Sequence, residues 1–174
     1  MRLQGFFLFL AVLMSAVSSA QAAPVPTALF GLELFDDTLQ PEPGGKKSPQ
    51  QERLALVNEE LARLFEASGQ VKLVDLGPQA ARIAEFAPLF KCNACETELA
   101  RAAGAKLEVV GVVRKISNLI LTITLVVREV DDEARPVRAG EVQIRGNTDE
   151  SWLRGVRYLV KNRILASGLP PLSP

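Results

Sequence analysis

The chain of 174 residues contains no histidine, and both of its methionines, Met1 and Met14, lie near the amino terminus. Without an imidazole, Ser–His–Asp and Cys–His catalysis are excluded, and so are metal sites built on histidine. Neither sign of charge is in excess, because Lys and Arg number 20 and Asp and Glu also number 20. A dedicated nucleic-acid binder usually carries a strong positive excess. The composition therefore argues against nucleic acid as a partner.

The amino terminus has the pattern of a cleaved export signal. Arg2 precedes the apolar run FFLFLAVLMSAV, and Ala20-Gln21-Ala22 supplies the A-x-A site of signal peptidase. The run is shorter than the roughly 20 residues of a membrane-spanning helix, and no Cys lies near the cleavage site to anchor a lipoprotein. We predict a signal peptide over residues 1–22, a periplasmic location, and no integral membrane span after cleavage. Full secretion is the alternative destination.

Residues 23–167 have the size and composition expected of a single α/β domain, with 48% hydrophobic and 23% charged residues in the whole chain. Apolar and β-branched runs predict strands over residues 28–35, 71–76, 107–116, 119–130 and 137–145. Apolar residues at steps of three and four, with end signals, predict helices over residues 49–68, 78–90, 93–104 and 149–166. The order β-α-β-α-α-β-β-β-α predicts one mixed β-sheet of about five strands with helices packed on it. Residues 168–174 are expected to form a flexible tail.

Several end signals in the sequence are specific enough to test. Three candidate capping boxes are Ser48 with Gln51, Asn93 with Glu96, and Asn147 with Glu150. Gly69 is expected just after the first helix, where a left-handed residue commonly ends the last turn. In the fourth strand, Thr122 and Thr124 alternate with apolar residues. One face of the sheet is therefore expected to be partly exposed.

Cys92 and Cys95 are the only cysteines and the feature with the most obvious chemistry. In an oxidising compartment they predict a local disulfide, which would stabilise the fold by about 2 kcal/mol. A thiol–disulfide enzyme is the alternative, but thioredoxin-type sites place C-x-x-C after a strand, whereas a helix precedes this one. Zinc would need four ligands, and two cysteines without histidine do not supply them. We predict no catalytic residue, no metal and no cofactor.

The last predicted helix and the turn before it carry a candidate interaction surface. Arg154, Arg157 and Lys161 recur at steps of three and four, opposite the apolar face of the helix. Arg145 and Asn147 lie between the last strand and this helix. Together the five residues could meet an acidic partner or an anionic lipid. A solvated helix flank is the simpler interpretation.

The carboxy-terminal half resembles a secreted bacterial family of unknown function, through KCNACE, VVGVVRKISNLIL and above all IRGNTDESWLRGVRYL. The resemblance extends to the opening LFGLELFDDT and the strand VKLVDL. More coarsely, the element order is similar to the amino-terminal domain of the Tol–Pal propeller protein, the curli export lipoprotein and the lipoprotein activators of penicillin-binding proteins. These resemblances imply an α/β domain that contacts partners without catalysis. They assign no functional residue to this chain.

Three functions follow as hypotheses of different classes. The first is a soluble periplasmic accessory domain that binds another cell-envelope protein and is not an enzyme. The second is a thiol–disulfide redox protein that uses Cys92 and Cys95. The third is a small-ligand binder with a cleft beside the sheet, for which the sequence offers no specific residue. The sequence leaves the oligomeric state open.

Overall fold

A computed structural model describes residues 23–37, 48–131 and 135–172 of the chain. The predicted signal peptide, residues 1–22, lies outside these residues. The strands are β1 (Val25–Asp36), β2 (Val71–Leu73), β3 (Leu107–Lys115), β4 (Ile120–Glu129) and β5 (Pro136–Arg145). The helices are α1 (Pro49–Ala67), α2 (Ala80–Phe86), α3 (Cys95–Ala102) and α4 (Asp149–Leu159). Short helical turns precede α2 at Gly77–Gln79, precede α3 at Leu89–Lys91, and follow α4 at Val160–Ile164.

The five strands form one mixed sheet in the order β2-β1-β3-β4-β5. β1 is parallel to both of its neighbours, whereas β3, β4 and β5 are successively antiparallel. Parallel neighbours need a crossover, and α1 and the α2–α3 segment supply the two that this order requires. The predicted α/β class, element order and single mixed sheet are confirmed.

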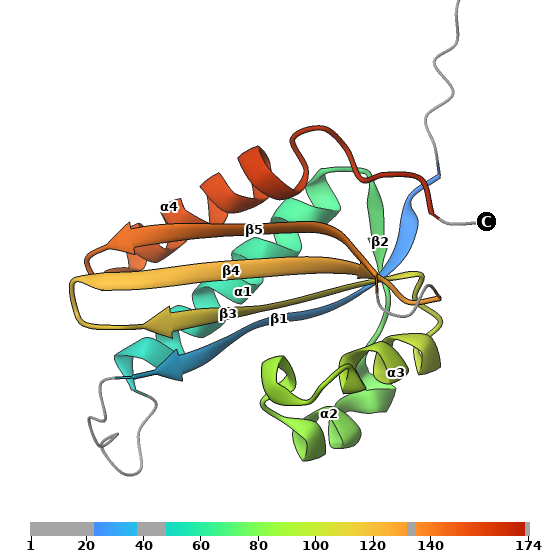
Figure 1. Ribbon diagram of the computed structural model, residues 1–174, viewed down its shortest axis with the longest axis horizontal. Helices are drawn as coiled ribbons and strands as arrows, with labels where there is room; N and C mark the ends of the chain where they lie inside the picture. The colour runs from blue at the N-terminus through green and yellow to red at the C-terminus, as the bar shows by residue number, and fades with distance from the viewer. Residues whose placement is uncertain (1–22, 38–47, 132–134, 173–174) are drawn as a thin grey trace, which may run out of the picture.

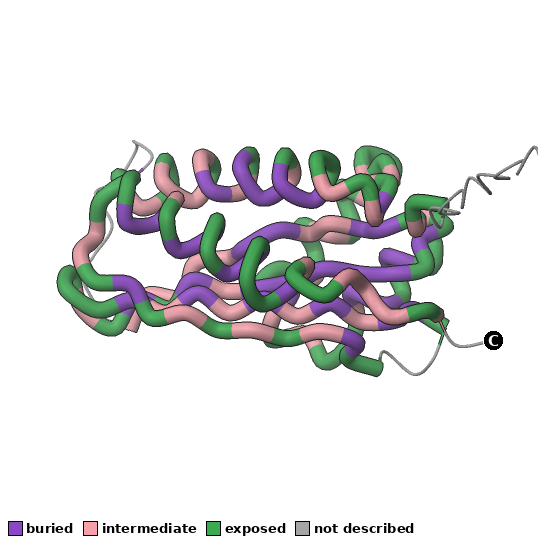
Figure 2. The backbone as a smooth tube through the Cα atoms, turned by 90° about the horizontal axis from the view of Figure 1, so that it is seen from above, coloured by how far each residue is buried: buried purple, intermediate pink, exposed green. Residues whose placement is uncertain are grey.

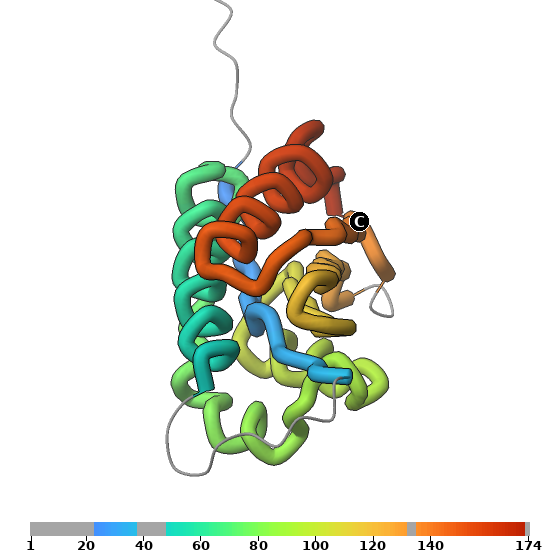
Figure 3. The backbone as a smooth tube through the Cα atoms, turned by 90° about the vertical axis from the view of Figure 1, so that its left-hand side faces the viewer, coloured from blue at the N-terminus to red at the C-terminus, as the bar shows by residue number. Residues whose placement is uncertain are grey.

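Helices lie on both faces of the sheet, but they cover the two faces unequally. On one face, α1 and α4 lie side by side along the strands (Figures 1 and 3). On the other face, α2 and α3 lie under one end of β1 and β3 (Figure 1). The described residues place no helix on this second face over much of β4 and β5.

The main hydrophobic core fills the space between the sheet and the α1–α4 pair. It is formed by alternate strand residues and by the inner stripes of the two helices, among them Val57, Leu61, Phe65, Val109, Val113, Ile123, Leu125, Trp152, Val156 and Leu159. Figure 2 shows these buried stretches where helices and strands face one another. Gly155 allows the close approach, since a Cβ atom there would lie 2.6 Å from the Cγ2 atom of Ile144.

The second face has smaller apolar clusters under its two short helices. Ala28, Ala100, Ala105 and Val130 form one cluster, and Leu89, Leu99 and Val110 form another. Beyond these helices, Thr122 and Thr124 are half-buried and Glu141 and Gln143 are exposed. The alternation of threonine with apolar residues in β4 therefore does mark a partly exposed face.

The first helix begins and ends as the sequence predicts. Ser48 Oγ accepts a hydrogen bond from the backbone N–H of Gln51 (3.2 Å), and Gln51 Oε1 accepts one from the N–H of Ser48 (3.1 Å). These two bonds are the reciprocal pair of a capping box. Gly69 follows the last turn with a φ of +67°.

The other two predicted capping boxes are wrong. α3 begins after Ala94, which makes no side-chain cap, and the carboxylate of Glu96 turns to Arg128 instead. α4 is capped one residue later than expected, by Thr148 with Ser151. Glu96, expected in the first cap, binds a residue that is distant in sequence. Asn147, expected in the second cap, accepts from Trp152 Nε1 instead.

Two predicted helices are also shorter than expected. The helix predicted over residues 78–90 ends at Phe86, because Pro88 cannot continue it. The last helix changes to a π-helical turn at Val160. Leu169 and Leu172 then pack against the main core, and the N–H of Leu169 donates to Gln70 Oε1. Among the described residues, no helix is long and apolar enough to span a bilayer.

Candidate functional site

A groove of about 380 Å³ lies on the second face, between the start of α3 and the strands β3 and β4. Its lining comprises Leu89, Phe90, Asn93, Ala94, Glu96, Val110, Gly111, Val112, Thr124, Val126 and Arg128. One wall is the Cys92–Cys95 segment, and the floor is the partly exposed sheet. The groove is the cleft beside the sheet that the third hypothesis requires.

The two cysteines are joined by a disulfide that closes the wall of the groove. The Cα atoms of Cys92 and Cys95 are 5.6 Å apart. The two residues between them are both left-handed, with φ of +54° at Asn93 and +74° at Ala94. Such a pair of non-glycine residues turns the chain sharply, so that α3 can start directly beneath the sheet.

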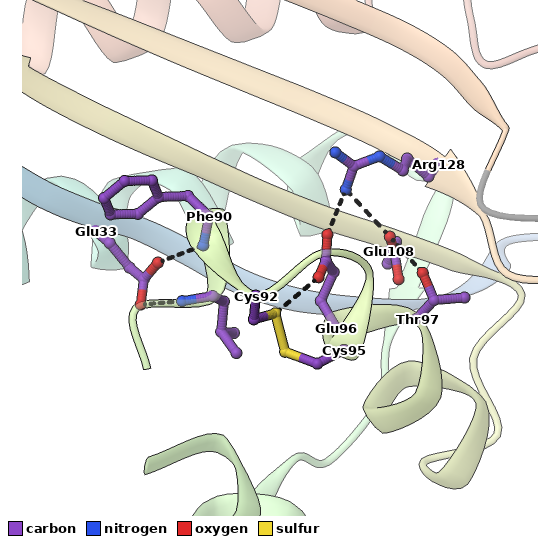
Figure 4. Close-up of a disulfide and its surroundings, with 9 residues drawn as sticks. Glu33, Phe90, Cys92, Cys95, Glu96, Thr97, Glu108 and Arg128 are labelled. Atoms are coloured by element: carbon purple, nitrogen blue, oxygen red, sulfur yellow. Dashed lines mark hydrogen bonds and ion pairs between the residues drawn. A yellow bond between two sulfur atoms is a disulfide. The ribbon is translucent and has the colours of Figure 1, made fainter. Parts of the chain in front are cut away.

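Glu33 fixes the segment that leads into the disulfide. Its two carboxylate oxygens accept from the N–H groups of Leu89 and Phe90, each at 2.9 Å (Figure 4). The ring of Phe90 meets the ring of Phe35 edge to face, with centroids 5.8 Å apart. A carboxylate that accepts two backbone N–H groups positions a turn that has no side-chain cap of its own.

A cluster of buried charge lies beside the groove. Arg128 Nη1 is 2.7 Å from Glu96 Oε1 and 3.3 Å from Glu108 Oε1 (Figure 4). Thr97 Oγ1 donates to the same oxygen of Glu108 at 3.1 Å. Two buried carboxylates therefore share one guanidinium, and the cluster carries an uncompensated negative charge when both are ionised.

Glu108 is the member of this cluster whose carboxylate is incompletely hydrogen-bonded. Its side chain is fully buried, and its second oxygen, Oε2, has no hydrogen-bond partner among the described residues. Burial first, and then the charge of Glu96, raises the pKa of Glu108 above its ordinary value of 4.5, although Thr97 and Arg128 act in the opposite sense. Proton uptake by Glu108 would remove the excess charge.

The surroundings of the disulfide do not favour thiol chemistry. Glu96 Oε2 lies 3.2 Å from Cys92 Sγ. A disulfide sulfur has no proton to donate, and in a reduced chain the carboxylate would disfavour the thiolate that exchange requires. Sγ of both cysteines and a Glu96 oxygen lie within 4.8 Å of one another, but disulfide sulfurs are not thiolate ligands. The arrangement is that of a cross-link, not of a nucleophile.

Four of the five predicted surface residues lie around two hollows beside α4, and the fifth, Asn147, holds a turn. Asn147 Oδ1 accepts from Trp152 Nε1 at 3.0 Å, so it holds the turn before α4. Arg157 Nε donates to Glu60 Oε1 at 2.6 Å and links α4 to α1. Arg154 is exposed on α4 and Lys161 on the helical turn that follows it, and both line one hollow with Arg157. Arg145, at the exposed end of β5, lines a second hollow together with Arg154.

The sequence did not identify the charged cluster beside the groove. Its visible signal was a charged residue inside each of two apolar strands, Glu108 in LEVVG and Arg128 in LVVRE. The antiparallel register places these two residues directly opposite each other. Local spacing in the sequence predicts neither that register nor the contact of Glu96 on α3 with Arg128, because both depend on tertiary structure.

The fold and the groove define a mixed α/β domain in which helices cover one face of the sheet more fully than the other. Within that class, the chain belongs to the DUF3280 family, described as "Protein of unknown function (DUF2380)", whose model matches residues 26–164. The predicted membership of a family of unknown function is confirmed. No curated protein matches the chain.

Solved structures that are similar to this chain come from bacteria. The PelC dodecamer from Paraburkholderia phytofirmans is 12% identical, with 81% of this chain and 88% of that chain covered and a TM-score of 0.51. Lipoprotein GNA1162 from Neisseria meningitidis is 13% identical, with 83% and 99% covered and a TM-score of 0.50. The LpoB C-terminal domain from Salmonella enterica is 12% identical, with 72% and 86% covered and a TM-score of 0.49. At these identities the likeness to PelC and to GNA1162 establishes the fold alone.

Proposed function

We propose that the chain is a non-catalytic accessory domain of the cell envelope that binds another envelope protein. The export pattern of residues 1–22 supports a periplasmic location, with cleavage before Ala23. Sequencing the amino terminus of the exported protein tests this part. A mature chain that starts at Ala23 is expected, and a retained leader would contradict the proposed location.

The observation that carries the proposal is an exposed apolar end on the β3–β4 hairpin. Leu119 is 72% exposed, Ile116 48% and Ile120 39%. The backbone here is a tight turn in which Ser117 Oγ accepts from the N–H groups of Leu119 and Ile120. Three large apolar side chains held together on a rigid turn are typical of a protein-contact site. The partner is therefore expected to offer an apolar surface to this hairpin end.

The charged groups near the groove favour a binding role over catalysis. Glu96 is paired with Arg128, and Glu33 is occupied by two backbone N–H groups. Glu108 is buried beneath them. A general acid or base has to reach a substrate atom, whereas these carboxylates are turned toward the chain itself.

Two basic residues on α4 and the turn after it are proposed as secondary contacts with the partner. Arg154 and Lys161 are exposed, and an acidic rim on the partner would suit them. Contacts of this kind mainly speed association and weaken as salt rises. Lys161→Glu is therefore expected to weaken the complex more at low salt than at high salt.

The test is retention of a periplasmic partner by tagged protein, followed by site-specific cross-linking from position 119. The wild type and a control variant, Lys72→Ser on β2, should retain the same protein and cross-link to it. The double variant Ile116→Ser/Leu119→Ser should lose it while keeping its melting temperature. Retention unchanged in the double variant, binding to lipid vesicles through the hairpin end, or substrate turnover by the purified chain would each contradict the proposal.

A further inference from the structure

β5 has an unpaired edge along the side of the sheet, since the described residues place no strand beyond it. Just after β5, the N–H of Gly146 donates to the carbonyl of Leu119, the residue before β4. Because backbone groups alternate along an antiparallel strand, residues 141, 143 and 145 direct their N–H and C=O groups to the free edge. A long unpaired edge is a template for another strand.

The side chains along this edge are complementary to themselves. On the second face of the sheet, β5 exposes Glu141, Gln143 and Arg145 in that order. We propose that this edge pairs antiparallel with β5 of a second copy of the chain, about a two-fold axis at Gln143. Glu141 of each copy then lies directly opposite Arg145 of the other. The two sheets join into one continuous sheet of ten strands.

The charges select this register from the registers that the free backbone groups allow. An axis at Glu141 would place two glutamates directly opposite each other, which is destabilising. An axis at Val142 would pair Glu141 with Gln143 and leave Arg145 opposite Ala139. Only the axis at Gln143 gives two opposite-charge pairs. The pairs at 141 and 145 are also hydrogen-bonded pairs, as the free backbone groups require.

The helix side of the same edge is complementary as well. In this register Val142 of one copy lies opposite Ile144 of the other. Beside these residues, β5 and α4 form a hollow of about 290 Å³, lined also by Arg154, Gly155 and Tyr158. Tyr158 is 45% exposed there. A second copy along the edge would cover this apolar material, which a closed two-fold interface does with one patch used twice.

This interface is separate from the contact proposed for the envelope partner. The hairpin end uses Ile116, Leu119 and Ile120, whereas the edge uses β5 and one side of α4. The edge pattern points to a second copy and not to an unrelated strand. When two copies of β5 run antiparallel, Glu141 of each meets Arg145 of the other. Failure of either proposal leaves the other unaffected.

The first test is a charge exchange followed by sedimentation equilibrium. Glu141→Arg and Arg145→Glu each create two like-charge pairs, and each is expected to weaken the dimer by roughly tenfold. The double variant Glu141→Arg/Arg145→Glu restores both pairs in reversed order and should recover the wild-type dissociation constant. A wild type that is monomeric at its highest soluble concentration, or a double variant as weak as the single ones, would overturn the proposal.

The second test measures the register through an introduced cysteine in the oxidised chain. Two Cα atoms in a hydrogen-bonded antiparallel pair are about 5.5 Å apart, which suits a disulfide. Gln143→Cys lies on the proposed axis and should form a covalent dimer. The control Ala139→Cys, two pairs away on the same face, should not. Equal cross-linking at both positions, or cross-linking at 139 alone, would refute this pairing.

Discussion

Two buried glutamates show that cationic neighbours, more than burial alone, decide how a carboxylate is held. Glu60 meets Arg63 at 2.7 Å and Arg157 at 2.6 Å. Glu108 shares a single guanidinium with Glu96 and has one oxygen without a partner among the described residues. The pKa of Glu60 is therefore lowered, whereas the pKa of Glu108 is raised.

Glu60 is expected to make the fold sensitive to acid. The hydrogen bond from Arg63, with a further contribution from Arg157, lowers the pKa of Glu60 from 4.5 to about 2. Its stabilising contribution is then complete above pH 4.5 and is lost as the pH falls toward 2. Because both guanidinium groups are half-exposed, Glu60→Gln should cost only about 1 kcal/mol of unfolding free energy at pH 7. Urea unfolding at several pH values measures this.

A matched control for that experiment is Glu59→Gln, which removes an exposed carboxylate next along the helix. It should follow the wild-type pH dependence throughout. If Glu60→Gln kept the acid sensitivity of the wild type between pH 4.5 and 2, the assigned ion pairs would not be contributing.

Glu108 is expected to have the opposite effect. Its raised pKa means that the folded chain holds the proton more tightly than the unfolded chain. Stability is then greatest below pH 4.5 and falls as the pH rises through the folded pKa. Glu108→Gln keeps the shape and removes the buried charge, so it should raise the unfolding free energy by about 1 kcal/mol at pH 7 and little at pH 4.

The control for Glu108 is Glu96→Gln, which breaks the shorter pair with Arg128. That variant should be less stable than the wild type at pH 7. A loss of stability in both variants at neutral pH would mean that Glu108 is ionised and well compensated in the folded chain.

At the scale of elements, local chemistry predicted the helices and strands well, but it did not predict all of the helix ends. Ser48 and Gln51 cap α1 as their spacing indicates, since nothing else competes for them. Glu96 does not cap α3, because Arg128 lies 32 residues away in sequence and directly beside it in space. The role of Glu96 in the site depends on the strand register that places Arg128 beside it. Contacts between residues far apart in sequence set that register, so local spacing does not predict it.

The loop between the two cysteines offers a test at this scale. Ala94 is exposed and left-handed, a conformation that costs an alanine about 1 kcal/mol relative to the right-handed one. Ala94→Gly should therefore raise the unfolding free energy of the oxidised chain by about 0.5 kcal/mol after the greater freedom of the unfolded glycine is deducted. Ala102→Gly, at the last residue of α3, should lower it, by less than the roughly 1 kcal/mol that glycine costs in a helix interior. Thermal and urea unfolding of both variants would settle the sign.

At the scale of the whole molecule, the class and the element order could be predicted, but the strand order could not. Apolar and β-branched runs located β3 and β4. Placing β1 between β2 and β3 requires two crossovers, and no local signal specifies which strands they bring together. The groove beneath α3 follows from that order, so it too was beyond the sequence.

The disulfide is expected to contribute to stability and not to activity. Closing this short loop is worth about 2 kcal/mol by its effect on the unfolded chain. Cys92→Ser/Cys95→Ser should lower the unfolding free energy by that amount and make it insensitive to reductant, while partner binding at the hairpin end persists. Insulin reduction or disulfide exchange by the wild type, lost in this variant, would instead support the redox hypothesis.

The unequal cover of the sheet implies a hierarchy of local opening. The α1–α4 layer rests on aromatic and branched side chains, whereas α3 meets β1 largely through alanines such as Ala28 and Ala100. Small contacts resist separation less, so amide hydrogens in α2 and α3 should exchange with deuterium well before those in α1. When α2 and α3 separate transiently from the sheet, β3 becomes exposed to solvent while the α1–α4 layer stays packed. The Cys92–Cys95 disulfide would keep the turn before α3 closed in this open state.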